Sequence, residues 1–145
     1  MIFSAQQLFS DDQAITATAV STNVIDLGAP QTAYGAKAAF HQDIGKGNPV
    51  PILVQVTEDF ATLTSLTITI EVSAAANLSS STVLSSQTIA VADLKKGKQI
   101  AAQVLPNGAD QRYLGVRYTV TGSNATTGKV TAGITMGNQT NVTGV

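Results

Sequence analysis

The sequence predicts an all-β fold, an antiparallel β-sandwich or jelly roll of about eight strands. Apolar and polar residues alternate with a period of two in several segments, the pattern of strands with one buried face. Breaks rich in glycine, proline and asparagine separate these segments. No segment shows a sustained helical period, which disfavours an α/β layout.

The composition is that of one domain with few charges. The chain has 145 residues, and its 12% of charged residues is half of the usual share of about 25%. The net charge of −1, without a basic cluster, predicts no nucleic-acid partner. The absence of cysteine excludes a disulfide framework, thiolate zinc sites and a cysteine nucleophile. No apolar run has the length of a membrane span and the N-terminus lacks a signal-peptide pattern, so we expect no membrane association.

The chain divides into an N-terminal arm (1–12), a β-sandwich (13–136) and a C-terminal tail (137–145). These first residues are too few for an independently stable helix and are expected to form a single helical turn or an arm. The apolar residues among them pack either on this domain's own core or on a neighbouring chain; they are Ile2, Phe3, Leu8 and Phe9. The tail carries Val142 and Val145 as its sizeable apolar residues.

The strands of the sandwich are expected in a regular series. The predicted ranges are 13–20, 23–27, 51–57, 66–73, 83–91, 100–105, 112–121 and 129–136. A turn begins at Glu58, and another covers 92–98, where Asp93 is a possible helix N-cap and Gly97 a stop. Residues 28–50 contain four glycines and two prolines with little periodicity, and such long irregular connections are usually functional or mobile.

The last two strands are predicted to form a hairpin across the polar linker 122–128. Its inner row is expected to include Leu114, Val116, Tyr118, Val120, Val130, Ala132 and Ile134. Tyr113 and Arg117 fall on the opposite row, where they could offer a flat docking surface.

The residues that could carry catalysis do not form a known constellation. His41 is the single histidine, so neither a two-histidine metal site nor a serine triad with a Gly-x-Ser-x-Gly elbow is expected. Three acid-base candidates are the acidic pairs at 11–12 and 58–59 and Glu71 with a cross-strand carboxylate. Turn and cap roles fit them better, because neighbours in a strand point to opposite faces. We therefore predict no enzyme activity and no metal or cofactor.

Contact residues are expected in the loops and arms. Besides the arm and tail residues above, the 28–50 loop offers Tyr34, Phe40 and His41. Lys95, Lys96 and Lys98 form a small basic knob, which is either a solvated turn or a docking point for an acidic partner.

Three stretches carry a family resemblance. They are Met1–Thr16 (MIFSAQQLFSDDQAIT), Ser21–Gly28 (STNVIDLG), and Arg112–Gly122 (RYLGVRYTVTG) with Lys129–Ile134 (KVTAGI). In this order the chain resembles the jelly-roll capsid cement, or decoration, proteins of short-tailed bacteriophages. The resemblance implies a virion protein on the outer surface of an icosahedral head, made in the host bacterial cytoplasm. Its partners would be the major capsid protein and itself, as a homo-oligomer with a dimer favoured over a trimer.

The alternative is a β-sandwich binding module of the tail-fibre or carbohydrate-binding type. Such a module needs exposed aromatic residues for stacking on sugars, and this chain has no Trp and three Tyr. Retention on a glycan column would support the module, whereas co-fractionation with phage heads would support cement.

Overall fold

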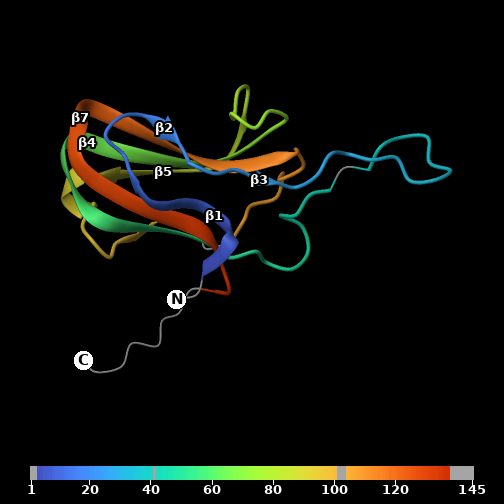
Figure 1. Ribbon diagram of the computed structural model, residues 1–145, viewed down its shortest axis with the longest axis horizontal. Coiled ribbons are helices and arrows are strands. Elements are labelled where there is room, and N and C mark those ends of the chain that lie inside the picture. The colour runs from blue at the N-terminus through green and yellow to red at the C-terminus, as the bar shows by residue number, and fades with distance from the viewer. Residues whose placement is uncertain (1–2, 41, 101–103, 138–145) are drawn as a thin grey trace.

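The computed structural model describes residues 3–40, 42–100 and 104–137, and their strands form one antiparallel sheet (Figure 1). Two long strands, β4 (Ile52–Ser73) and β7 (Tyr113–Thr135), lie side by side at its centre. β1 (Phe3–Ala14) pairs with β7, and β5 (Thr82–Ala90) pairs with β4. The predicted all-β, antiparallel class is confirmed.

Short elements complete the sheet. β2 (Ala19–Val20) and β3 (Ile25–Asp26) pair with the first half of β7, and β6 (Gln99–Ile100) pairs with the first half of β4. A single turn of 3-10 helix, Val91–Asp93, follows β5.

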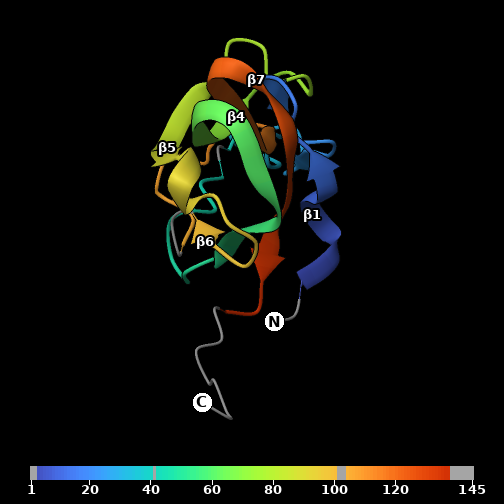
Figure 2. The same cartoon turned by 90° about the vertical axis from the view of Figure 1, so that its left-hand side faces the viewer.

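Both long strands bend near their middle, so the sheet folds back on itself into two layers (Figures 1 and 2). The register between β4 and β7 shifts repeatedly between Val56 and Ser65, and such irregularities bend strands. Gly122 and Gly128 on β7 have φ of +90° and +138° there, values that side chains rarely tolerate. One layer holds β1, β6, the first half of β4 (52–61) and the second half of β7 (127–135). The other holds β2, β3, β5 and the remaining halves.

The core lies between these two layers. The alternation in the second half of β4 places every second residue inside, as predicted, and the same holds for β7. The fully or almost fully buried residues of these two strands include Val54, Val56, Leu66, Ile68, Ile70, Val72, Leu114, Val116, Tyr118, Val130 and Ala132.

The predicted hairpin at 112–136 is wrong. The two arms do not pair with each other, because β7 continues through residues 122–128 as one bent strand whose halves both pair with β4. The predicted turn at Glu58 is wrong for the same reason, since β4 runs through it. A polar segment with glycines can form a bend within one strand as well as a hairpin turn. Here β4 and β7 have similar lengths, so each supplies hydrogen-bond partners for the other's backbone on both sides of the bend.

Of the two forms considered for the N-terminal residues, the helical turn is wrong for the described residues, because residues 3–14 form β1. Of the two packing alternatives, Phe9 takes the domain's own core, where it is fully buried. The predicted strand 13–20 is interrupted, because β1 ends at Ala14 and bends separate it from β2. Asp93 is the last residue of the 3-10 helix and not its N-cap.

The predicted strand 100–105 is described only at its ends. β6 covers Gln99–Ile100, and Val104 forms a single bridge with Pro51. Residues 101–103, and the tail residues 138–145, lie outside the described residues.

Candidate interaction surface

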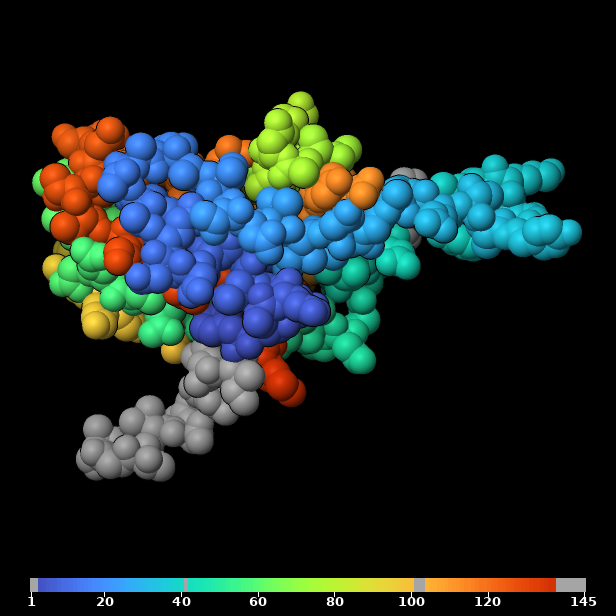
Figure 3. All heavy atoms as spheres, in the orientation of Figure 1, coloured from blue at the N-terminus to red at the C-terminus, as the bar shows by residue number. Residues whose placement is uncertain are grey.

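The most exposed part of the structure is the projecting loop, defined here as residues 28–42. It extends away from the two layers beyond β3, as a thin cyan segment in Figure 1, and stands clear of the body in the space-filling view (Figure 3). Every described residue of the loop is exposed. The irregular segment 28–50, predicted as a contact region, therefore includes a loop that projects from the body of the molecule.

The projecting loop is folded back on itself. The Phe40 amide donates a hydrogen bond to the Gln31 carbonyl oxygen (2.9 Å), which forms an isolated antiparallel bridge. Nearer the tip, the Ala36 amide donates to the Ala33 carbonyl oxygen (3.0 Å), and Gly35 supplies a φ of +81°. The tip is thus a tight turn between two adjacent arms.

The first end of the loop is fixed by a bidentate ion pair. Arg112 Nε lies 3.0 Å from Asp26 Oδ1, and Arg112 Nη2 lies 2.8 Å from Asp26 Oδ2. Asp26 Oδ1 also accepts the Gly28 amide at 2.9 Å, and these bonds, led by that from Arg112, lower the pKa of the Asp26 carboxyl. The guanidinium lies 5.0 Å from the ring centroid of Tyr113, a cation–π distance.

The second end is fixed by the Asp43 carboxylate, which accepts three backbone hydrogen bonds. The donors are the amides of Gly45 (3.0 Å), Gly108 (2.9 Å) and Ala109 (3.1 Å). The bond from Gly108 is the largest of the influences that lower the pKa of this carboxyl. Asp43 therefore joins the end of the loop to the turn before β7.

Two aromatic side chains stand in solvent on this fixed base. Tyr34, within the tip turn, is fully exposed, and Phe40, nearer the base, is 61% exposed. The aromatic residues Phe9, Phe60 and Tyr118 are by contrast buried. Lys37 is the single formally charged residue of the sequence between 28 and 42.

A hollow of about 450 Å³ lies where the loop meets the body. It is open to solvent and has mixed polar and apolar walls. Among its lining residues are Leu27, Pro30, Phe40, Asp110, Gln111 and Arg112.

Comparison with known protein families gives one match. The model of the family named Bbp16 matches residues 9–134, from the core residue Phe9 to the end of β7. The chain belongs to the Bbp16 family. This is a phage-related family, and the match includes the projecting loop and both long strands. No curated protein matches the chain.

Other predicted contact residues of this Bbp16-family chain occupy varied positions. Phe3 and Leu8 are half-buried and lie against Gly133 of β7. Phe9 cannot serve as a contact, because the core encloses it completely; the residue lies in a strand, where alternation turns it inward. Ile2, His41, Val142 and Val145 lie outside the described residues.

The three lysines of the basic knob lie in an exposed turn after the 3-10 helix, at the opposite end of the molecule from the projecting loop (Figure 1). Lys95 Nζ lies 3.4 Å from Asp59 Oδ2, and the Lys96 amide donates to Asp59 Oδ1 at 2.6 Å. The Asp59 carboxylate therefore offsets part of the positive charge of the three lysines. This arrangement fits a solvated turn better than a docking point for an acidic partner.

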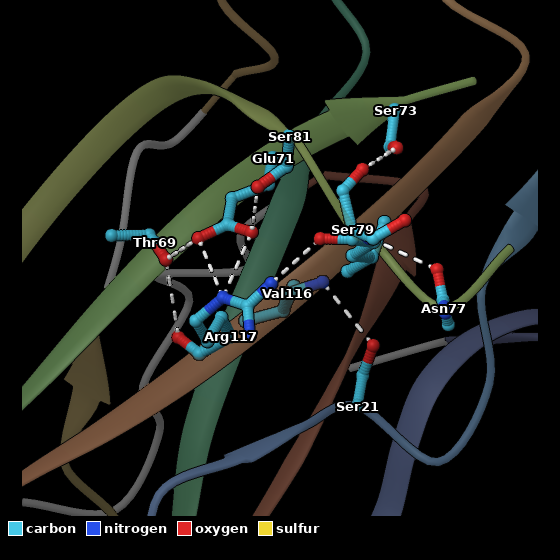
Figure 4. Close-up of polar contacts among 10 residues, drawn as sticks. Ser21, Thr69, Glu71, Ser73, Asn77, Ser79, Ser81, Val116 and Arg117 are labelled. Atoms are coloured by element: carbon cyan, nitrogen blue, oxygen red, sulfur yellow. Dashed lines mark hydrogen bonds and ion pairs between the residues drawn. The ribbon is translucent and has the colours of Figure 1, made fainter. Parts of the chain in front are cut away.

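Arg117 does not stand free on a flat surface beside Tyr113. Its Nε lies 3.0 Å from Oε2 of Glu71, and its Nη2 donates to the Leu78 carbonyl oxygen at 2.9 Å (Figure 4). Glu71 also accepts hydrogen bonds from the hydroxyls of Thr69 (2.6 Å) and Ser81 (2.7 Å). The pair fastens the loop after β4 onto the outer surface of the sheet.

The neighbouring packing supports the same conclusion. Leu78 is buried, and a Cβ on Gly115 would lie 2.7 Å from its Cδ1 atom. Sequence reasoning considered Glu71 only as an acid-base candidate and missed this ion pair. The pairing of Thr69 with Arg117 across β4 and β7 brings the two charges together, and that register is not visible in either strand alone.

The described residues offer no group of three His, Cys, Asp or Glu side chains that could hold a metal ion. Within the same residues, no helix has the length and apolar character needed to cross a membrane.

Proposed function

We propose that this chain is a structural protein of the phage virion, a capsid cement or decoration protein. It binds the outer surface of an icosahedral head and stabilises contacts between major capsid subunits. The observation that carries the proposal is the projecting loop, a fixed protrusion with two solvent-exposed aromatic side chains. Membership of a phage-related family supports the same class of function.

The physical basis is preorganised binding. Because the Asp26 and Asp43 contacts hold both ends of the loop in the free protein, less conformational entropy is lost when the loop docks. A ligand that binds only the mature shell stabilises that shell by mass action. Many copies on one lattice add avidity, so each individual contact can be modest.

The proposal includes the partners and location that the resemblance implies. The protein associates with itself, with a dimer favoured over a trimer, and with the major capsid protein. It is made in the host bacterial cytoplasm and ends on the outside of the head. It has no enzymatic role, and it engages neither nucleic acid nor membrane.

Binding to expanded and immature shells tests this function. The purified protein is mixed with each kind of shell and the bound fraction is measured by co-sedimentation. We expect saturable binding to expanded shells, little binding to immature shells, and a higher melting temperature of the decorated shell. Absence of binding to expanded shells, or retention of the protein on a glycan column without shell binding, would contradict the proposal and favour the carbohydrate-binding alternative.

A further inference from the structure

We propose that the projecting loop, with Tyr34 in its tip turn and Phe40 nearer its base, is an aromatic anchor that inserts into an apolar cleft with an acidic rim on the major capsid protein. Tyr34 and Phe40 fill the cleft, and Lys37 pairs with a carboxylate at its rim. This inference rests on the proposed function and specifies the chemistry of its contact.

Exposure of the two rings is the first ground. Tyr34 is fully exposed and Phe40 is 61% exposed, whereas the aromatic side chains of Phe60 and Tyr118 are buried in the core. An aromatic side chain buries about 150–250 Å² when it is enclosed, and tyrosine is enriched at the centres of interfaces. The two rings are therefore the side chains of the loop with most to gain from a partner's apolar cleft.

Charge is the second ground. Two carboxylates at the base of the loop are engaged, Asp26 by Arg112 and Asp43 by backbone amides, and Asp110 lies lower, in the wall of the hollow. Between residues 28 and 42, the positive charge of Lys37 is the single formal charge of the sequence. A complementary partner carries negative charge around the cleft. One lysine is too few for a nucleic-acid surface, which needs clustered cations.

Shape is the third ground. The Gln31–Phe40 bridge near the base and the turn at Gly35 give the loop a defined narrow form, and all of its described residues are exposed. A narrow, prearranged protrusion fits a concave site better than a flat one.

Substitutions at the tip test the anchor. The variants Tyr34→Ala, Phe40→Ala and Lys37→Glu are compared with wild type for their dissociation constants on expanded shells. Val83→Ala and Lys98→Glu are matched controls, because Val83 is an exposed apolar residue of β5 and Lys98 an exposed lysine at the opposite end of the molecule. All five residues are exposed, so the melting temperatures should stay within about 1 °C of wild type.

We expect each aromatic variant to bind on the order of 30-fold more weakly, the loss typical of a central anchor. Lys37→Glu should bind at least about fivefold more weakly, with a loss that shrinks at high salt, and both controls should bind like wild type.

Three results would overturn the inference. If the wild type binds expanded shells and the Tyr34→Ala and Phe40→Ala variants bind equally tightly, the aromatic anchor is excluded and the cement function is retained. If Lys37→Glu binds expanded shells as tightly as the wild type or more tightly, an acidic rim on the partner is excluded. Self-association that is lost in Tyr34→Ala while shell binding is retained assigns the tip to a second copy of the chain. Failure of the wild-type protein to bind any shell would instead overturn the proposed function together with this contact.

Discussion

Removal of the Arg117 guanidinium should destabilise the protein more than any exposed charge change. In Arg117→Met, the aliphatic part of the side chain is kept while the partner of Glu71 is lost. The Glu71 side chain is 4% exposed, so its carboxylate would stay buried with only the hydroxyls of Thr69 and Ser81 as donors. The bond that holds the Leu78 carbonyl would also disappear.

The expected cost follows from this burial. Breaking a buried ion pair on one side typically costs 3–5 kcal/mol, because the remaining charge is uncompensated. Arg117 is 31% exposed, and two hydroxyls still serve Glu71, so we expect the lower end, about 3 kcal/mol. Against a total stability of about 5–15 kcal/mol, the variant should still fold.

Urea unfolding at neutral pH measures the effect, and a double variant provides the control. Glu71→Gln combined with Arg117→Met leaves no buried charge, so it should be more stable than Arg117→Met alone by about 1–3 kcal/mol. A loss below about 1 kcal/mol in the single variant, or a double variant whose losses simply add, would refute the reasoning that the pair is a buried, coupled contact.

Three further outcomes follow from the fold. Gly128→Ala should lower the urea midpoint clearly more than Gly97→Ala. Both glycines have positive φ, but of the two only a Cβ on Gly128 would meet another side chain, the ring of Phe60. Equal losses would contradict the tight packing at the bend. Burial raises the pKa of Tyr118, so the folded state keeps a proton that the unfolded chain releases near pH 10. Stability should therefore fall as the pH rises above about 10, and spectrophotometric titration of Tyr118→Phe should lack the phenol that ionises only with unfolding. Backbone hydrogen bonds lower the pKa of Asp43, so the unfolded state binds its proton first and stability should fall as the pH drops below about 4. In Asp43→Asn the melting temperature should vary less between pH 5 and pH 2, and an unchanged slope would contradict the role of the carboxylate.

Local alternation predicted which apolar residues in the second half of β4 face the core. Leu66, Ile68 and Ile70 of β4 are buried as their period indicated. The same signal could not show whether neighbouring segments are separate strands or halves of one bent strand, because that depends on a distant pairing partner. Residues 122–128 have the polar and glycine-rich character of a hairpin loop, yet the register with β4 makes them a bend.

The candidate surface was predictable in location and not in construction. Lack of periodicity between 28 and 50 indicated the loop, and Tyr34 and Phe40 are exposed there. The contacts that fix its ends join Asp26 to Arg112 and Asp43 to Gly108, pairs that are distant in the sequence. Side chains brought together by tertiary structure leave no local pattern, which is also why the Glu71 ion pair was missed.

The continuity of β4 and β7 has a consequence for how the protein folds and fails. Each long strand belongs to both layers, so neither layer can detach while the other remains intact. The pairs between them run from Ile52 with Ile134 to Ser73 with Tyr113, all far apart along the chain. Such a topology delays productive collapse until distant segments meet, and it predicts slow folding with one cooperative transition. A protein built this way would lose its shape in one step, without partly opened forms that expose strand edges to neighbouring copies.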